Sequence, residues 1–460
     1  NTLLRLLLLA LVMVSGLETA FAQPARPVRP RLIVLTDIGG DPDDQQSMVR
    51  LMLYSSEFEI EGMIASAAGT PGELKTNITR PDLIREIVNA YGQVRTNLLV
   101  HRRFYPPTEQ LLSVIKSGNP LRGTNVIGPG HDTEASRWII RQADKQNIHP
   151  LNIAVWGGST DLAQALWRVR EDCSPEELKA FLGKLRVYSI AHQDDSGPWI
   201  NREFPDLFYV LANRPEGQDK RNSSYRGMYL GGNELLTSRE WIDENVRKDH
   251  GPLGALYPPR TWTVPNPHGA LKEGDTASWF YFLPNGLGDS EHPEWGGWGG
   301  RFQKLNGQLY GDAPAQRGEE VDPRVSVSRW RPAYQNDFAA RMDWCVKPLL
   351  EANHPPIAIL NNRPGRDVVE LNVRSKEHVA LSANGSSDRD GQNIQYRWWI
   401  YEEAGTYEGP VALRGSTTAE SSFEAPRVTE LVDIHVILEI TDDGKPPLTA
   451  FRRAVVHVRP

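Results

Sequence analysis

The 460-residue sequence predicts two folded domains: an α/β domain with a doubly wound, mostly parallel sheet, followed by a small all-β sandwich. Over most of the chain, short apolar runs alternate with amphipathic helical segments, which is typical of parallel βαβ units. From about His354 onward the pattern changes to β-rich segments separated by Gly and Asp turns, which favours a β-sandwich.

In the first domain, apolar runs predict buried strands, and apolar residues three or four positions apart predict helices. The expected strands are 32–35, 59–65, 97–101, 153–156 and 187–190, and the expected helices are 45–54, 81–90, 136–140, 161–169 and 278–282.

In the second domain, 379–381, 394–401 and 434–440 are the expected strands. Trp398 and Trp399 are adjacent and point to opposite faces of a strand, so at least one of them should lie in the core. The turns 386–391 and 441–444 either bind a structural calcium ion or are simply solvated, and we expect solvated turns.

The N-terminus has the features of a secretory signal peptide. Arg5 precedes the apolar stretch 6–14, and Ala20-Phe21-Ala22 supplies a small-x-small cleavage site. We therefore expect a signal peptide over 1–22 with cleavage after Ala22, domains at 23–352 and 353–460, and a secreted or periplasmic protein. The apolar stretch is too short to predict a membrane span.

The charge balance argues against a nucleic-acid partner. The net charge is −7 and no block of Lys or Arg interrupts the chain. The two cysteines, Cys173 and Cys345, could pair in an oxidising compartment, but they form no motif, and we expect structural roles for them.

The most informative segment is a group of four carboxylates, Asp37, Asp41, Asp43 and Asp44, directly after the apolar run 32–35. Acids this close together repel one another unless they are solvated, protonated or gathered around a cation. A hard, oxygen-seeking ion such as Ca²⁺ suits them, and sites in α/β proteins lie beyond the carboxyl ends of strands. The alternative is that the acids cap the following helix.

Two further element ends carry polar signals. In 156–161, Trp-Gly-Gly-Ser-Thr-Asp, paired glycines let the backbone approach a ligand before a helix starts. In 274–277, Gly-Asp-Thr-Ala, an acid precedes an apolar helix. Each segment alone is typical of a turn or a cap, but their joint occurrence at the ends of sheet elements indicates a site.

These motifs resemble those of the nucleoside hydrolase superfamily. The segment 36–39 and the pair Asp43-Asp44 match the two ends of its first signature, 157–161 matches its central turn, and Asp275 matches its late acid. More narrowly, the chain is similar to an exported branch of cellulose-binding, nucleoside-hydrolase-like proteins with a C-terminal immunoglobulin-like domain. The segments that carry this second resemblance are 37–47, 156–166, 273–276 and 295–301.

The resemblance implies a sheet of nucleoside hydrolase type and a calcium ion held by Asp37, Asp44, Asp275 and the backbone carbonyl of Thr160. It also implies that Asp37 acts as the general base, that Asp43 grips the sugar, and that metal-activated water cleaves a glycosidic bond.

The chain also departs from the superfamily pattern. Leu35 replaces the first signature acid, and Gly274 stands where many members have a histidine that helps the base to leave. The superfamily's sugar-binding motif Glu-Phe-Asn is matched only in part, near residues 201–204. The candidate sugar contacts are therefore Asn201 and Glu203, or the pair Asp194-Asp195. The sugar-and-metal half of the site is therefore expected to be kept, and the nucleobase half is not.

Trp295, Trp298 and Arg301 lie on a Gly-rich loop. Exposed indoles there would stack on sugar rings, and the alternative is that they pack beneath the loop. The histidines 131, 192 and 268 are candidate acids, for which we expect structural or surface roles because no metal-ligand spacing links them.

The sequence therefore predicts an exported, calcium-dependent, glycosidase-like hydrolase that cleaves an N- or O-glycosidic bond of a saccharide or glycoside. The alternative is a non-catalytic protein that binds cellulose or another polysaccharide through the same fold. Asp37 and Asp44 favour the enzyme, whereas Gly274 and the tryptophan loop favour the binding protein.

Overall fold

The structure is a computed structural model that describes residues 29–68, 77–214, 217–259, 270–317 and 320–460. The expected signal peptide lies outside these residues. Among the helices that are described, none is both long enough and apolar enough to cross a membrane.

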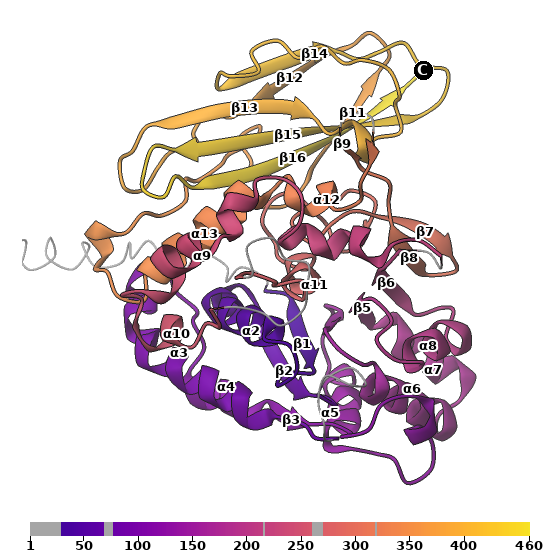
Figure 1. The fold of residues 1–460 in the computed structure, drawn as a ribbon. Coiled ribbons are helices and arrows are strands. Elements are labelled where there is room, and N and C mark those ends of the chain that lie inside the picture. The colour runs from indigo at the N-terminus through magenta and orange to yellow at the C-terminus, as the bar shows by residue number, and fades with distance from the viewer. Residues whose placement is uncertain (1–28, 69–76, 215–216, 260–269, 318–319) are drawn as a thin grey trace, which may run out of the picture.

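The first domain is built on an eight-stranded sheet with the order β3-β2-β1-β4-β5-β6-β8-β7. Neighbouring strands are parallel except for β7, which runs antiparallel to β8. The predicted doubly wound, mostly parallel sheet is confirmed (Figure 1). The strands are β1 Arg31–Thr36, β2 Glu59–Ala65, β3 Ile115–Ser117, β4 Leu151–Val155, β5 Leu185–Ile190, β6 Phe208–Ala212, β7 Phe302–Asn306 and β8 Leu309–Asp312.

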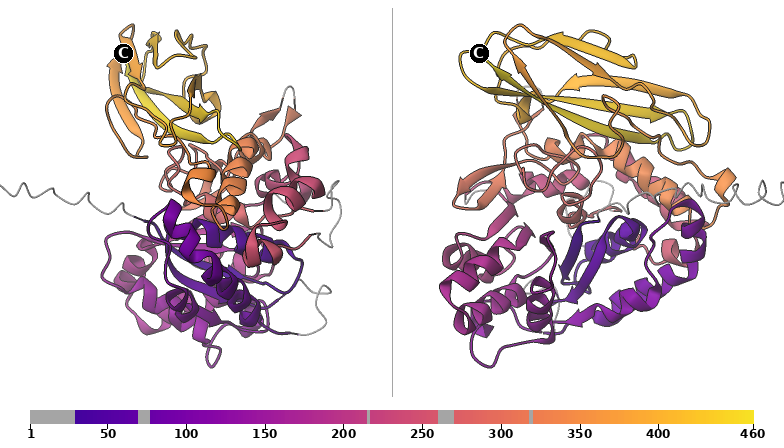
Figure 2. Two further views of the ribbon diagram at one scale, coloured as in Figure 1. Left: turned by 90° about the vertical axis from the view of Figure 1, so that its left-hand side faces the viewer. Right: turned by 180° about the vertical axis from the view of Figure 1, so that it is seen from behind.

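Helices cover both faces of this sheet, as the views in Figures 1 and 2 show. The α-helices are α2 Asp43–Tyr54, α3 Pro81–His101, α4 Thr108–Ser113, α5 Glu134–Ala143, α6 Thr160–Asp172, α7 Pro175–Gly183, α8 Ser196–Glu203, α9 Arg239–Ile242, α10 Gly251–Ala255, α11 Thr276–Phe280, α12 Val325–Ser328 and α13 Arg331–Asp343. Short 3₁₀ turns and one π-helical turn, Asp243–Arg247, connect several of them.

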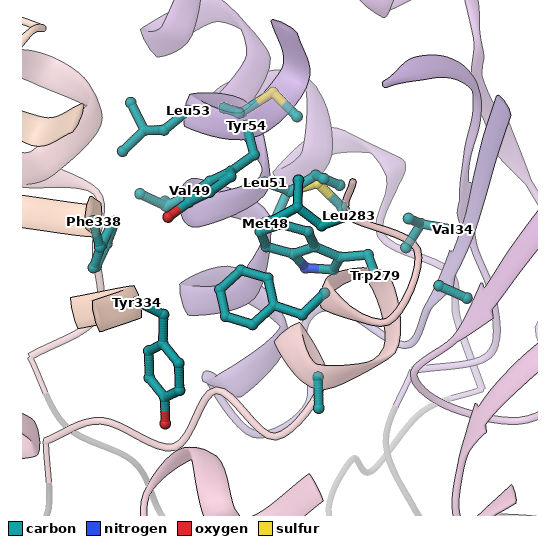
Figure 3. Close-up of a cluster of buried hydrophobic side chains, with 14 of the residues drawn as sticks. Val34, Met48, Val49, Leu51, Leu53, Tyr54, Trp279, Leu283, Tyr334 and Phe338 are labelled. Carbon is teal, nitrogen blue, oxygen red and sulfur yellow. The ribbon is translucent and has the colours of Figure 1, made fainter. Parts of the chain in front are cut away.

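Alternate residues of β1 enter two different hydrophobic cores. Leu32 and Val34 pack with α2, α3 and α11, whereas Ile33 and Leu35 pack with α5 and α6. Figure 3 shows the first core, where the Tyr54 ring of α2 lies 5.2 Å from the Trp279 ring of α11. Because both faces of β1 are buried, the strand is apolar throughout and its polar residues come only at its end.

The expected strand at 97–101 is wrong, because these residues form the last turns of α3. Buried positions recur along that helix at Ile84, Val88, Tyr91 and Leu98, while Val100 is exposed. The apolar run at the end of α3 is therefore one part of a longer helical stripe. The strand that does follow α3 is the short edge strand β3.

The C-terminal domain is all β, as predicted. One sheet has the order β11-β16-β15-β13, and a second sheet pairs β12 with β14. Its strands are β11 Val369–Arg374, β12 His378–Ser382, β13 Ile394–Ile400, β14 Glu420–Glu424, β15 Val432–Asp442 and β16 Thr449–Arg459. Trp398 is buried in the core between the sheets, which confirms the expectation for the tryptophan pair, and Trp399 faces the other way.

The two domains share one apolar contact. Trp330 of the first domain lies 5.8 Å from the ring of Trp399 and 5.6 Å from that of Phe451. Phe451 belongs to the same hydrophobic core as α2 and α11. The β-sandwich therefore packs directly against the α/β domain (Figure 1).

A buried carboxylate reinforces this junction. Glu57, only 4% exposed, accepts ion pairs from Arg102 at 2.7 Å, Arg341 at 2.9 Å and Arg366 at 3.1 Å. Arg366 lies in the segment that leads into the C-terminal domain. Burial alone would raise the pKa of Glu57, but the three arginines outweigh burial and hold the pKa at about 2.

We expect Glu57→Gln to lower the free energy of unfolding at pH 7 by about 3 kcal/mol, because the buried Arg341, the half-buried Arg102 and the exposed Arg366 lose their counter-charge. Since the folded-state pKa is depressed from 4.5 to about 2, this contribution is fully present above pH 4.5 and is lost as the pH falls toward 2. The difference between the variant and the unmodified protein should therefore shrink over that range in denaturant titrations. Glu59→Gln is the control, because Glu59 is 46% exposed in its ion pair, and equal stability of the two variants would contradict the prediction.

Candidate metal centre

The candidate site lies where the sheet changes direction. The neighbours of β1 are β2 on one side and β4 on the other, so the carboxyl ends of β1 and β4 form the switch point of the doubly wound sheet. Asp37 follows β1 directly, and Gly157 follows β4. A Cβ atom on Gly157 would lie 2.5 Å from Cγ of Asp37, so only glycine permits this approach.

Asp43 and Asp44 occupy the first turn of α2, where their charges suit the positive end of the helix. The N-cap residue is Pro42, and no side chain makes a capping hydrogen bond there. These acids therefore form no side-chain cap, whereas the other part of the alternative, that they favour the positive end of the helix, fits their position.

Three carboxylates converge at this point. Asp43 and Asp44 of α2 and Asp275, just before α11, each offer an oxygen within 4.8 Å of the others. Asp44 and Asp275 were expected to share a metal, and Asp43, expected to contact sugar, joins them. Asp37 is 7% exposed and lies close enough to raise the pKa values of all three, but it is not one of the converging ligands.

The electrostatics of this cluster favour a cation. Burial, followed by repulsion among the acids, raises the pKa of Asp43 to about 7 and raises the pKa values of Asp44 and Asp275 well above their usual range. Oδ2 of Asp275 is buried and has no hydrogen-bond partner among the described residues. An all-oxygen, acidic and under-satisfied set of ligands fits a hard ion such as Ca²⁺.

Helix α2 holds the segment that carries Asp275. Gln46 accepts a hydrogen bond from the backbone N–H of Lys272 at 2.8 Å and donates to the carbonyl of Ala270 at 2.6 Å. Arg50 and Glu273 form an ion pair in which both side chains are fully buried, with Nη2 of Arg50 3.1 Å from Oε1 of Glu273. The third carboxylate is thus positioned by one face of the helix that supplies the other two.

Two cations of the chain itself contact the acids. Nη2 of Arg122 lies 2.6 Å from Oδ2 of Asp37. The ammonium of Lys272 contacts Asp41 and lies 3.4 Å from Oδ2 of Asp43. Burial would lower the pKa of Lys272, but Asp43 and Asp41 raise it, so Lys272 stays charged. The sequence analysis missed both residues, because neither lies in a motif.

Thr160 is the first residue of α6. Its hydroxyl donates to Oδ2 of Asp194 at 3.0 Å and accepts from the N–H of Gly123 at 2.8 Å. Whether its carbonyl binds the metal stays a prediction. The second glycine of the motif, Gly158, lies against Asp194, where a Cβ would come within 2.3 Å of Oδ2.

The expected sugar contacts are mostly engaged in the protein's own hydrogen bonds. Asp195 accepts from the N–H and hydroxyl of Thr124 at 2.8 Å and 2.7 Å. Asp194 accepts from Ser196 and Thr160. These four bonds hold loops in place. Direct sugar binding by these aspartates stays a prediction.

Asn201 and Glu203, the residues of the partial sugar-binding motif, also contact other side chains of the protein. Glu203 pairs at 3.1 Å with both Arg170 and Arg202 on the surface, and Nδ2 of Asn201 lies 3.4 Å from Nε2 of His192. Burial lowers the pKa of His192 to about 4, so this ring is neutral near pH 7. His131 is half-buried, and His268 lies outside the described residues.

The expectation of exposed indoles on the tryptophan loop is wrong. Trp295 is 7% exposed and Trp298 is 4% exposed. Trp298 packs edge-to-face on Phe280 at 5.1 Å and on Phe451 at 6.2 Å, so it fills the contact between the domains. Arg301 donates to the carbonyl of Pro314. The loop tryptophans are therefore packing residues, which agrees with the alternative that they lie beneath the loop.

The cysteines do not pair: Cys345 is buried and Cys173 is exposed, and both are free thiols in the described part of the chain. Cys345 thus has the structural role that was expected, and no disulfide stabilises the fold.

Comparisons with known proteins agree with this fold. Residues 31–302 match the family model described as cellulose-binding Sde182, nucleoside hydrolase-like domain. The chain belongs to this family. Residues 378–458 match the C-terminal domain of cellulose-binding protein Sde0182, so both halves of the family architecture are present.

A solved structure of a nucleoside hydrolase-related hypothetical protein from Saccharophagus degradans, associated with carbohydrate metabolism, is 33% identical with a TM-score of 0.81. The match covers 94% of this chain and 100% of that one. The effector protein XOO4466 is 11% identical with a TM-score of 0.38, covering 70% of this chain and 95% of that one, a score too low to support a conclusion. No curated protein matches the chain.

We expect Asp275→Asn to remove calcium binding at this centre without unfolding the metal-free protein, because the change removes one of three converging like charges. At a free Ca²⁺ concentration about 100 times the Kd, the stabilisation by calcium should be smaller by about 2.7 kcal/mol in the variant. Thermal unfolding with Ca²⁺ or EDTA measures this difference.

The matched control is Asp312→Asn. Asp312 is also buried, at 6% exposure, but Ser224 satisfies its carboxylate, and it lies outside the converging set. The control should keep the full calcium-dependent shift. An equal shift in the Asp275 variant would show that this cluster does not hold the ion.

Proposed function

We propose that this family member is an exported, carbohydrate-active hydrolase that binds Ca²⁺ at the switch point of its sheet and cleaves a glycosidic bond of a saccharide or glycoside. The observation that carries the proposal is the convergence of Asp43, Asp44 and Asp275, of which Asp44 and Asp275 are buried and Asp43 is half-buried, with one oxygen of Asp275 left without a partner among the described residues. Such a set is costly to bury unless it binds a cation.

Asp43, Asp44 and Asp275 would hold the calcium ion, which would supply Lewis acidity to a nearby water molecule. Asp37 accepts the proton of the attacking water, and Arg122 fixes the orientation of its carboxylate through the 2.6 Å contact. The surrounding aspartates stabilise the positive charge that develops on the sugar in an oxocarbenium-like transition state.

The leaving-group side of the site differs from that expected for a nucleosidase. A Cβ on Gly274 would lie 2.8 Å from the ring of Tyr225, so this tyrosine excludes a larger residue at the position of the superfamily's histidine. Burial raises the pKa of Tyr225, which keeps its phenol protonated. Tyr225 is therefore a candidate donor to a leaving oxygen.

The second candidate function is binding of cellulose or another polysaccharide without catalysis. The family description as cellulose-binding supports it, as does the engagement of the acids by the protein's own Lys272 and Arg122. In this case the carboxylates would hold structure or sugar, and no bond would be cleaved.

We expect Asp37→Asn to reduce turnover of the best p-nitrophenyl furanoside or pyranoside at least about 100-fold, because loss of a positioned base costs that much. EDTA should abolish the same turnover. Release of p-nitrophenol, followed with Ca²⁺ and with EDTA, measures both effects.

Asp206→Asn, an exposed aspartate away from the motif, is the control for activity. Sedimentation with microcrystalline cellulose separates the two functions. If no glycoside is cleaved and cellulose retention is indifferent to Asp37→Asn, the hydrolase proposal is overturned and the binding function stands.

A further inference from the structure

The loops of the β-sandwich that face the α/β domain clamp the segment between the domains. Nδ2 of Asn353 donates to Oδ1 of Asp442 at 3.0 Å and to the carbonyl of Pro446 at 2.8 Å. Nε2 of Gln392 donates to Oδ1 of Asn353 at 2.7 Å. The next residue, His354, donates its N–H to Asp390 at 2.8 Å. The turns 386–391 and 441–444 thus meet at the start of the second domain.

Three oxygen atoms in this group have no hydrogen-bond partner among the described residues. They are Oδ2 of Asp388, Oδ2 of Asp442 and Oε1 of Gln392, and all three atoms are buried. Asp442 as a whole is only 4% exposed. Each of the three atoms can only accept, so none can satisfy another.

In both aspartates, backbone N–H groups hold the other carboxylate oxygen, Oδ1. Oδ1 of Asp388 accepts from the N–H of Asp390 at 2.7 Å and of Gln392 at 3.2 Å. Oδ1 of Asp442 accepts from the N–H of Gly444 at 3.0 Å and of Leu448 at 2.9 Å. The unpartnered oxygens therefore keep their positions because their sister atoms are held by the backbone.

The three side chains are close neighbours. A Cβ on Gly444, whose N–H binds Asp442, would lie 2.4 Å from Oε1 of Gln392. Burial raises the pKa of Asp442, and the charge of Asp388 raises it further. Among the ion pairs of the described chain, none links Asp388 or Asp442 to a Lys or Arg.

We propose that Asp388, Asp442 and Gln392 form a second cation site, which takes Ca²⁺ and ties the β-sandwich to the segment between the domains. Two carboxylate oxygens and one amide oxygen are ligands for a hard divalent ion. The nearby imidazole nitrogen Nδ1 of His354 is already bound to Asp390 at 2.9 Å, which leaves an all-oxygen set. The proposal is independent of the hydrolase function and of the Asp43, Asp44 and Asp275 centre.

The experiment measures Ca²⁺ bound per full-length chain by equilibrium dialysis with elemental analysis, in a background of Asp275→Asn. We expect one bound ion in that background and none when Asp388→Asn is added, with an affinity loss of at least tenfold. Asparagine keeps the Oδ1 acceptor of Asp388 and removes the repulsion with Asp442, so the variant should stay folded in EDTA. Asp442→Asn is the second variant, with the same expected loss.

Asp443→Asn is the matched control, because Asp443 is the neighbour of Asp442 and its carboxylate is bound to the side chain and backbone of Asn393. It should keep the bound ion. No ion in the Asp275→Asn background, or full binding in both the Asp388 and Asp442 variants, would overturn the proposal and leave water as the occupant. If the first centre fails to bind, the unmodified protein should hold one ion that Asp388→Asn alone removes.

Discussion

The structure depends on the burial of several carboxylates at one end of β1. Asp43, Asp44 and Asp275 repel one another where two of the three are buried and Asp43 is half-buried, and Asp37 adds a fourth charge beside them. The fold tolerates this because its own guanidinium and ammonium groups contact the outer acids and because oxygen ligands remain for a cation. The glycine at 157 and the buried pair of Arg50 and Glu273 are needed to bring these groups together.

At the junction between the domains, a buried carboxylate is likewise contacted by cations of the protein. Glu57 is buried there with three arginines, and its charge is balanced within the protein. Asp442 is buried and Asp388 is half-buried at the same junction, and no ion pair among the described residues includes either of them, which supports an ion from outside the chain. The balance of charge among buried groups is thus a feature of the domain junction as well as of the candidate catalytic centre.

The tryptophans of the loop 295–301 have a different role in the folded protein from the one that their sequence pattern predicts. Tryptophans beside glycines predict a sugar-stacking surface when only the sequence is considered. In the folded protein Trp298 and Trp295 are covered, because the β-sandwich docks on the loop and its aromatic rings fill the contact. Whether a side chain is exposed depends on which domain lies over it, and no local pattern contains that information.

The sequence by itself determined the alternation of strands and helices, the all-β second domain and the acids after β1, because periodicity and turn chemistry act over a few residues. It also identified Asp275, through the resemblance of its motif. Only the tertiary structure decided that 97–101 is helical, that Asp43 converges with Asp44 and Asp275, and which cations meet the acids. Arg122 and Asp37 are 85 residues apart, and Lys272 and Asp41 are 231 apart. Contacts over such separations are fixed by the packing of the whole sheet and its helices, and the chemistry of neighbouring residues carries no trace of them.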